Sequence, residues 1–320
     1  MIQLNPQGMM LYVDSLELSI DKHGRNSFIS HAHLDHLFKP SRTTGILASD
    51  ATLDLMDARG WKTPGMERLC LKDAGVRVEL VNSGHVLGSS QLYVEDSDAF
   101  VYTSDFKLND SMTMKGAEVR ECDILLIEST YGSPEFIFPS REGVEARIAD
   151  WVKKEQERGS IVVLGGYTLG KAQELIGILN EYAGITPIVN RPIARVCGVY
   201  EKHGIKLDYV SSDSEEAKEL LKKSFVSVLP MNFVRYDVLK GLEEAYGRRV
   251  RGAIASGWAL ARSFNAHEVF CLSDHADYPQ LLEYVERSGA KKIICMHGFA
   301  QRLAGELRRK GYAAVAVEEL

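Results

Sequence analysis

Short apolar runs separated by turn residues characterise the first part of the chain, up to about residue 135. Runs with the period of a β-strand cover residues 9–13, 16–20, 27–30, 76–81, 91–94, 100–103 and 124–127. Helical spacing occurs at residues 50–59, where Asp50 is the expected N-cap. This part of the chain is therefore predicted to be rich in strands.

The pattern changes after about residue 140. Helices are predicted at residues 141–157, 171–182, 193–203, 215–223, 236–245, 278–287 and 301–310. Apolar strands are predicted between them at residues 160–164, 187–190, 224–229, 250–255, 292–295 and 313–317. Strands that alternate with helices predict a parallel sheet with helical crossovers. Because no Pro-, Gly- or Ser-rich linker separates the parts, the middle block is expected to be inserted into one globule.

Composition narrows the choice of function only slightly. The chain has 320 residues, a hydrophobic fraction of 45% and a net charge of −6, which argues against a non-specific coat on nucleic acid. The scattered cysteines are expected to be buried free thiols of a reducing compartment; they are Cys70, Cys122, Cys197, Cys271 and Cys295. No leader-like start and no membrane-length apolar run are found, so the chain is predicted to be cytoplasmic, without a membrane partner.

One short stretch, Ser30 to His36, concentrates the residues that carry chemistry. His31 and His33 are two positions apart, so in an extended backbone their side chains leave on the same face and can reach one ion. Asp35 and His36 follow where the chain begins to turn, so they are expected to point towards a second ion. Imidazole and carboxylate suit zinc or a similar divalent metal. The alternative is a set of surface histidines, but three of the nine histidines within six residues favour a metal site.

Further candidate ligands stand at the ends of predicted strands. His85 lies in a loop where Gly84 and Gly88 permit a tight turn. Asp105 ends another strand, and its two oxygens could bridge two cations. His275 and His297 each follow an apolar run. A lone histidine at a strand end is usually structural, but several such ends beside the cluster at Ser30 to His36 favour a site for two metals.

These motifs together resemble a known family. The series is H-x-H-x-D-H at residues 31–36, G-H-x-x-G-S at 84–89, S-D-F at 104–106, E-S-T-Y-G at 128–132, L-G-K-A-Q-E at 169–174, A-S-G at 255–257, D-H-A-D at 274–277 and H-G at 297–298. It resembles the β-CASP branch of the metallo-β-lactamase fold, which contains nucleases of RNA 3′-end processing and DNA repair. The chain is most similar to the short prokaryotic DNA-ligase-associated exonucleases. The resemblance implies an α/β fold, an αββα sandwich formed by residues 1–133 and 267–320, with a compact α/β cap inserted at residues 134–266.

The resemblance also implies a role for individual residues. His31, His33 and His85 should hold the first metal, Asp105 should bridge, and Asp35, His36 and His297 should hold the second. The metals should be two Zn²⁺, with Mn²⁺ as the alternative. His275, paired with Glu128, should be the acid that protonates the leaving oxygen, and Asp35 is placed with them among the catalytic residues. Asp21 stands where the fold usually has an aspartate that orders the metal-binding loop.

Substrate contacts are expected from the inserted block. Lys171, Gln173 and Ser256 are placed among the substrate-binding residues. Lys171 opens a helix after a glycine turn, which suits a phosphate, and an ordinary solvated helix start is the alternative. Trp258 offers a ring for stacking a base or for packing at the cap interface, of which packing is the simpler interpretation. His23, His203 and His267 match no motif and are expected to be surface or structural residues.

These expectations combine into one prediction of function: a two-zinc phosphodiesterase, an exonuclease of single-stranded nucleic acid in which DNA repair is slightly favoured. RNA processing is the alternative, because His297 stands where many DNA-specific relatives carry an aliphatic residue. A small-molecule metallohydrolase of the same core fold and an inactive scaffold subunit are the remaining rivals. The expected partners are single-stranded DNA or RNA and proteins of DNA repair or ligation.

Overall fold

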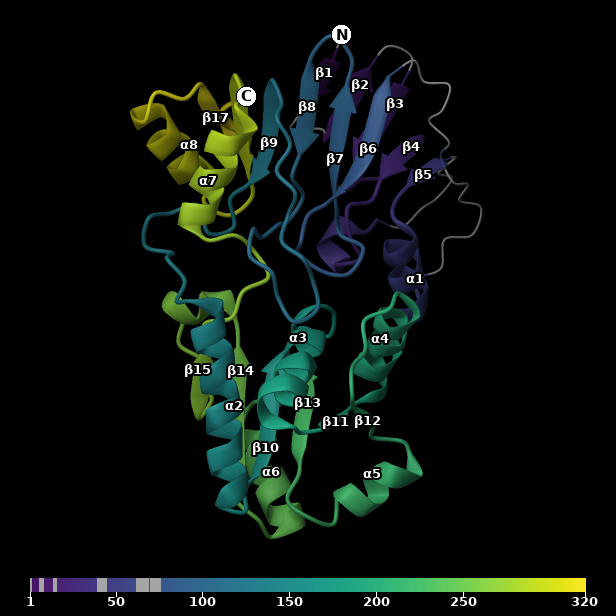
Figure 1. Ribbon diagram of the computed structural model, residues 1–320, viewed down its shortest axis with the longest axis vertical. Helices are drawn as coiled ribbons and strands as arrows, with labels where there is room; N and C mark the ends of the chain where they lie inside the picture. Colours follow the sequence, from purple (N-terminus) through teal and green to yellow (C-terminus); the bar gives the residue numbers. More distant parts are fainter. Residues whose placement is uncertain (1, 6–8, 14–15, 39–44, 62–68, 70–75) are drawn as a thin grey trace. The chain divides into compact units, whose positions relative to one another are not determined.

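The computed structural model describes residues 2–5, 9–13, 16–38, 45–61, 69 and 76–320, and it shows a mixed α/β protein with three sheets (Figure 1). The chain divides into two compact units. Unit 1 comprises residues 1–110, 114–137 and 275–320, and unit 2 comprises residues 111–113 and 138–274. Apart from residues 111–113, unit 2 begins after residue 137 and ends at residue 274, whereas the sequence pattern placed the boundaries near residues 133 and 266.

Unit 1 contains two sheets. The five-stranded sheet has the order β1-β2-β3-β4-β5, with bounds Ile2–Asn5, Met10–Val13, Leu16–Ile20, Asn26–Phe28 and Gly45–Leu47. The six-stranded sheet has the order β17-β16-β9-β8-β7-β6, with bounds Ala314–Ala316, Lys292–Met296, Ile124–Glu128, Ala99–Tyr102, Ser90–Glu95 and Arg77–Asn82. Three helices accompany them, α1 (Asp50–Ala58), α7 (Tyr278–Ser288) and α8 (Ala300–Arg309).

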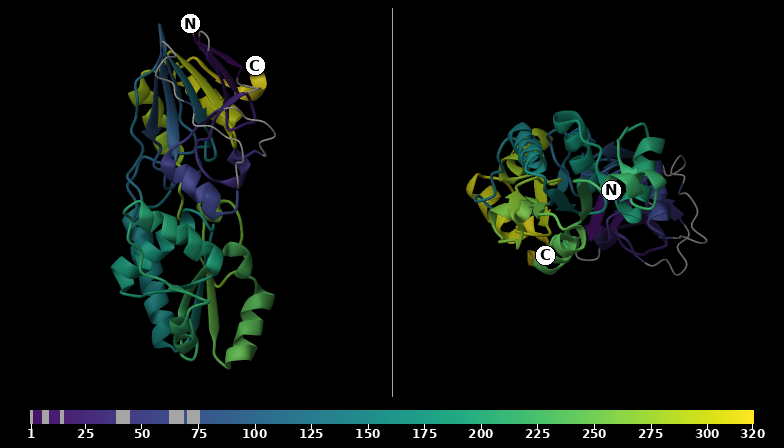
Figure 2. Two further views of the ribbon diagram at one scale, coloured as in Figure 1. Left: turned by 90° about the vertical axis from the view of Figure 1, so that its right-hand side faces the viewer. Right: turned by 90° about the horizontal axis from the view of Figure 1, so that it is seen from below.

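The core of unit 1 lies on both faces of the six-stranded sheet. One cluster of buried side chains joins this sheet to the five-stranded one and includes Leu18, Phe28, Leu92, Phe100 and Leu126. A second cluster joins the opposite face to α7 and α8. Figure 2 shows the same layering, with α7 and α8 on one side of the six-stranded sheet and the five-stranded sheet on the other. Successive side chains of a strand point to opposite faces of the sheet, so one strand contributes to both clusters. Leu126 belongs to the first cluster and Leu125 to the second.

Unit 2 is built on one parallel sheet of six strands in the order β12-β11-β13-β10-β14-β15. Its strands are β10 (Ile161–Gly166), β11 (Ile188–Val189), β12 (Val210–Ser211), β13 (Val226–Pro230), β14 (Val250–Ala255) and β15 (Glu268–Phe270). Its helices are α2 (Arg141–Glu157), α3 (Lys171–Ile178), α4 (Arg191–Lys202), α5 (Glu215–Leu220) and α6 (Tyr236–Tyr246). Apolar residues of β10, β13 and β14 pack with α6 in one buried cluster.

The sequence pattern located most long elements but missed several short strands. The helix predicted at residues 141–157 begins and ends as predicted. Strands β1, β5, β12 and β15 were not predicted, because each has only two to four residues, too few to show a period of their own. The predicted N-cap of α1 was wrong by one position, because Ser49 caps it and its Oγ accepts a hydrogen bond from the amide of Thr52.

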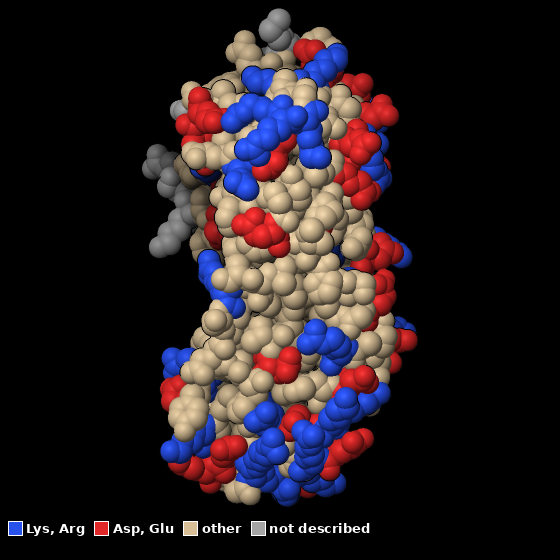
Figure 3. Space-filling view, turned by 90° about the vertical axis from the view of Figure 1, so that its left-hand side faces the viewer, with Lys and Arg blue, Asp and Glu red and all other residues tan. Residues whose placement is uncertain are grey.

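The cysteines and the surface add two observations. Cys122, Cys197 and Cys295 are buried free thiols, and burial raises the pKa of each to about 12. Cys271 is only partly buried, contrary to the prediction, and Cys70 lies outside the described residues. On the face drawn in Figure 3, basic and acidic side chains are interspersed. Within the described part of the chain, no helix combines the length and the apolar character needed to cross a bilayer.

Candidate metal centre

The ends of several strands bring the predicted ligands of unit 1 together. His31 and His33 follow β4, His85 follows β6 and Asp105 follows β8. One nitrogen from each histidine and one oxygen of Asp105 lie within 4.8 Å of one another. Residues separated by more than 50 positions thus meet at one point, and each of them lies shortly after the end of a strand.

The spacing of these four donor atoms fits a tetrahedral divalent ion. The Nδ1 atom of His33 lies 3.2 Å from Nε2 of His31 and 3.1 Å from Nε2 of His85. The Oδ2 atom of Asp105 lies 3.6 Å from Nε2 of His31 and 3.7 Å from Nε2 of His85. Ligands about 2.1 Å from a tetrahedral ion are about 3.4 Å apart. Three imidazoles and a carboxylate at this spacing match the chemistry of zinc and of similar first-row metals.

Burial prepares His31 to bind such an ion. Its side chain is fully buried, and burial, together with the imidazoles of His36 and His85, holds its pKa well below the usual range. The ring is therefore neutral at neutral pH, which is the form that coordinates a metal.

Asp105 lies at the centre of a larger group. Besides the contacts above, its Oδ2 atom lies 3.4 Å from Nε2 of His36 and 4.0 Å from Nε2 of His275. Burial acts to raise the pKa of Asp105, but the imidazoles of His36 and His275 hold it well below its usual range. The carboxylate is therefore ionised, and its Oδ2 atom faces the imidazoles of His31, His36, His85 and His275. Its bridging role stays a prediction.

The second set of predicted ligands is more open. The Oδ2 atom of Asp35 lies 3.9 Å from Nε2 of His36, and the Asp35 side chain is 81% exposed. The rings of His36 and His297 have centroids 6.1 Å apart, and His297 is exposed. His36 contacts Asp105, and Asp35 and His297 lie next to His36. The assignment of these three residues to a second ion stays a prediction.

Glu128 and His275 form a pair next to Asp105. Both carboxylate oxygens of Glu128 lie 3.1 Å from Nδ1 of His275. The amides of Phe106 and Thr130 donate to Glu128 over 2.9 and 3.3 Å, so the buried carboxylate is held from two sides. This arrangement leaves Nε2 of His275 directed towards the Asp105 side of the site. Glu128, His275 and Asp105 also bring three ligand atoms within 4.8 Å of one another, so the same groups could hold a cation.

Asp21 organises the loop that carries His31 to His36. Its carboxylate accepts hydrogen bonds from the amide and the hydroxyl of Ser30, each 2.7 Å long. The hydroxyl of Tyr102 donates to Oδ2 of Asp21 over 2.9 Å, and Nδ1 of His36 lies 2.9 Å from the same oxygen. Burial acts to lower the pKa of His36, but the carboxylates of Asp105 and Asp21 raise it well above its usual value. Asp21 thereby fixes the His36 ring with Nε2 facing Asp105.

The backbone is strained at the same places. Among the described residues, Met9, Asp21, Ser104 and His297 are the non-glycine residues with positive φ, and the last three belong to or adjoin the site. Their φ values are 50°, 55° and 62° respectively. Non-glycine residues adopt this conformation only when the surrounding structure enforces it, which happens most often at functional sites.

Two residues that hold the ligand-bearing loops in place were not predicted from the sequence. The ammonium of Lys107, which is buried, donates to the carbonyls of Gly84 and His85, and Arg59 donates to the carbonyl of Ala32. Lys107 follows Asp105 by two positions, but nothing in the local pattern distinguishes a buried lysine from a solvated one. Gly84, predicted to permit a tight loop, has φ +72°, and a Cβ there would lie 2.7 Å from the carbonyl oxygen of Lys107.

The predicted substrate-binding residues of unit 2 are all buried and bonded within the protein. The Lys171 ammonium is 2.8 Å from Oδ1 of Asp274, so the alternative of a solvated helix start is wrong. Gln173 accepts a bond from the amide of Gly170 over 2.8 Å. Ser256 Oγ accepts a bond from the amide of Trp258 over 3.2 Å. These three side chains brace the loops that follow β10 and β14, and their contact with substrate stays a prediction.

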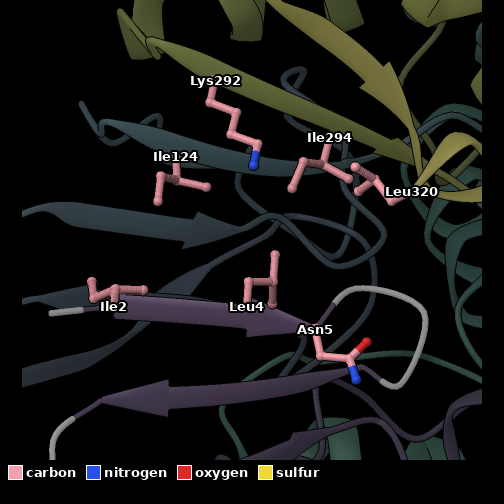
Figure 4. A pocket seen from close by; sticks show the side chains of 7 residues that line it. All are labelled: Ile2, Leu4, Asn5, Ile124, Lys292, Ile294 and Leu320. Carbon is pink, nitrogen blue, oxygen red and sulfur yellow. The ribbon is translucent and has the colours of Figure 1, made fainter.

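A cavity of about 390 Å³ in unit 1 lies away from this chemistry (Figure 4). It is lined by Ile2, Leu4, Asn5, Ile124, Lys292, Ile294 and Leu320. Figure 4 shows Ile2 and Leu4 on β1 across from Ile124 and Ile294 of the six-stranded sheet. None of the candidate ligands lines it, so the metal centre is a separate feature.

Two curated proteins illustrate what the chain is similar to. The chain is 31% identical to a probable DNA ligase of Opitutus terrae over 97% of this chain and 30% of the relative. It is 28% identical to an RNase J-like protein of Methanocaldococcus jannaschii over 61% of this chain and 52% of the relative. The chain thus spans only part of the length of either relative.

The solved structures add a likeness of fold. A crystal structure of a protein of unknown function from Enterococcus faecalis matches with a TM-score of 0.59 and 16% identity, over 87% of this chain and 76% of that one. No profile of a known protein family matches the chain. The motifs at the candidate metal centre and the similarity to these curated relatives fit the β-CASP family of metallo-β-lactamase-fold proteins, which the sequence resembles.

Proposed function

We propose that this protein is a two-metal nuclease that hydrolyses phosphodiester bonds of single-stranded nucleic acid, with exonuclease action on DNA as the first assignment. Unit 1 is assigned as the αββα sandwich and unit 2 as the inserted cap. The observation that carries the proposal is the convergence on Asp105. Its Oδ2 atom lies within 4.0 Å of a ring nitrogen of His31, His36, His85 and His275.

The chain offers ligands for two ions around this carboxylate. His31, His33, His85 and Asp105 would hold the first, and Asp35, His36, Asp105 and His297 the second. Zinc suits the imidazole-rich first set, and manganese is the alternative for the more open second set. When bound, such ions lower the pKa of a coordinated water and stabilise negative charge on a phosphoryl group.

His275 is assigned as the proton donor to the leaving oxygen. Its Nδ1 atom is held by Glu128, so its Nε2 atom is oriented towards the place where the scissile phosphate would bind beside Asp105. Glu128 is itself fixed by the amides of Phe106 and Thr130, so the imidazole loses little freedom when substrate binds. The role of Asp21 is to keep His36 in place before a metal or substrate arrives.

DNA is preferred because the relative that matches 97% of this chain is named a DNA ligase, although the match covers 30% of that relative. The same match supports a partner in DNA ligation or repair. RNA is the second candidate substrate, because the relative from Methanocaldococcus jannaschii is named RNase J-like. An inactive scaffold is disfavoured, because every predicted ligand position is filled. The Glu128–His275 pair argues against a small-molecule metallohydrolase.

The substrate assignment has a direct test. Incubated with end-labelled oligonucleotides, the purified protein is expected to cut single-stranded DNA faster than a blunt duplex and to lose this activity in a chelator. Matched DNA and RNA strands, each labelled in turn at either end, would give the preferred sugar and the direction of cleavage. Hydrolysis of a lactam or thioester without any nuclease activity would instead establish the small-molecule alternative.

The role of Asp21 gives a separate expectation about metal affinity. Replacing Asp21 with asparagine keeps the size of the side chain but removes the charge that faces His36 and Tyr102. Affinity for metal is expected to fall about 10- to 100-fold, which is typical when a group that orients a ligand is lost. Competition with a chromophoric chelator would measure it. Asp57→Asn, on an exposed turn of α1, is the matched control, and equal affinities for the two variants would contradict the role.

A further inference from the structure

Exposed aromatic and apolar side chains gather at one edge of the parallel sheet of unit 2, all of whose residues the structure describes. The large apolar side chains of this unit that are strongly exposed are Tyr167 (54%), Phe233 (41%), Tyr236 (66%) and Leu260 (46%). Tyr167 follows β10, Phe233 and Tyr236 follow β13, and Leu260 follows β14. Every one of them therefore lies just beyond the carboxyl end of a central strand.

The register of the sheet places these loops next to one another. Gly166 of β10 pairs with Pro230 of β13, and Gly165 pairs with Ile254 of β14. Neighbouring strands are about 4.8 Å apart, so the loops start side by side. Close packing confirms this, since a Cβ on Gly165 would lie 3.1 Å from Cα of Met231. In parallel sheets, ligands characteristically bind beyond the carboxyl ends of the strands.

Trp258 and Arg262 form a stacked pair on the same edge. The guanidinium carbon of Arg262 lies 4.4 Å from the centroid of the Trp258 ring, and Arg262 is exposed. The buried hydroxyl of Ser256 accepts a bond from the Trp258 amide, so the ring is carried by a braced turn. A planar cation over an indole presents both a flat surface and a positive charge.

The charge of these loops is opposite to that of the whole chain. Residues 167–170, 190–191, 231–236 and 256–264 contain three arginines and neither aspartate nor glutamate, in a chain whose net charge is −6. The arginines are Arg191, Arg235 and Arg262. Arg235 pairs over 2.9 Å with Asp237, which lies outside these loops and is 67% exposed. The loop after β12 carries Asp213, whose carboxylate interacts with Arg191. The loops after β10, β13 and β14 carry no acidic residue, so a polyanion is the ligand that complements this part of the edge.

We propose that Tyr167, Phe233, Trp258 and Arg262 form a stacking edge that binds the bases of a single strand, with Tyr167 after the middle strand, Phe233 on one side of it and the Trp258–Arg262 pair on the other. The inference rests on the proposed function and extends it by naming a binding surface within unit 2. Exposed rings bind unpaired bases of any sequence, and neighbouring arginines neutralise the phosphates between them. Bases in a duplex are already stacked on one another, so this edge selects single strands.

The test compares a normal oligonucleotide with one that has no bases. Metal-loaded protein carrying His275→Ala, so that the ligand is consumed slowly, is titrated with fluorescein-labelled oligo(dT) and with an abasic strand of equal length. Trp258→Ala in this background is expected to weaken oligo(dT) binding about tenfold or more and to leave the weaker abasic binding unchanged. Trp258→Phe should recover part of the loss, because it restores an aromatic ring. Phe233→Ala should act in the same direction as Trp258→Ala.

The controls distinguish base stacking from a general loss of affinity and from association between copies of the chain. Tyr12→Ala removes a 39% exposed aromatic side chain from β2 of unit 1 and should leave both affinities unchanged. Equal binding of oligo(dT) before and after Trp258→Ala, or an equal loss for both strands, would overturn the stacking edge. A lower sedimentation coefficient of the free protein after Trp258→Ala would also overturn it, since it would show that the edge joins two copies of the chain. If the unmodified protein hydrolyses neither oligonucleotides nor bis-p-nitrophenyl phosphate, the nuclease assignment fails, and the binding comparison still decides the edge separately.

Discussion

Replacing His31 and His33 together with alanine is expected to empty the first metal site and to reduce nuclease activity by at least about 10³-fold. The change removes two of the four donor atoms whose spacing, 3.1 to 3.7 Å, fits a tetrahedral ion. His85 and Asp105 alone leave the ion with too few protein ligands to compete with water and chelators. Elemental analysis is expected to find close to two ions per chain before the change and a clear loss after it.

The control removes the same number of imidazoles elsewhere. His23 and His203 match no motif, and neither lies among the groups of ligand atoms that converge in the described part of the chain. The double change His23→Ala with His203→Ala should keep both the metal content and the activity. Unchanged metal content after loss of His31 and His33, or full activity of the unmodified protein with a single ion, would refute the two-metal scheme.

Replacing His275 with alanine is expected to have a large effect of a different kind. Cleavage should slow by about 10²- to 10⁴-fold, the usual contribution of a general acid, while the metal content stays the same. The expectation rests on geometry: Nδ1 of His275 is held by Glu128 at 3.1 Å, and Nε2 lies 4.0 Å from Asp105. Single-turnover kinetics would show the loss in the chemical step rather than in binding.

His297 provides the comparison for His275. Its replacement by alanine should weaken the second metal, so that excess zinc or manganese restores part of the activity. No added metal should restore His275→Ala. If His275→Ala loses an ion and His297→Ala does not, the two histidines have exchanged roles, and the cluster of Asp105, Glu128 and His275 is then a metal site.

The sequence alone predicted much of this protein, where the information is local. Long amphipathic elements such as α2 were placed correctly, because a repeating apolar face needs only the residues of the element itself. The candidate ligands His31, His33, Asp35 and His36 could be recognised for the same reason, as they lie within six consecutive positions. Short strands such as β5 were not visible, because three residues pair only when a partner strand is already in place.

Only the tertiary structure decided how distant residues combine. It brought His85 and Asp105 together with His31, and it placed Asp105 in contact with His36 and His275 as well. It also showed that Lys171 is buried and paired with Asp274. The sequence pattern at the start of this helix had left a solvated side chain as an alternative. Local propensity depends on neighbours along the chain, whereas burial, ion pairing and donor-atom spacing depend on which strands end side by side. For this reason the types of ligand residue could be predicted from the sequence. The spacing of their donor atoms and the burial of charged side chains such as Lys171 could not.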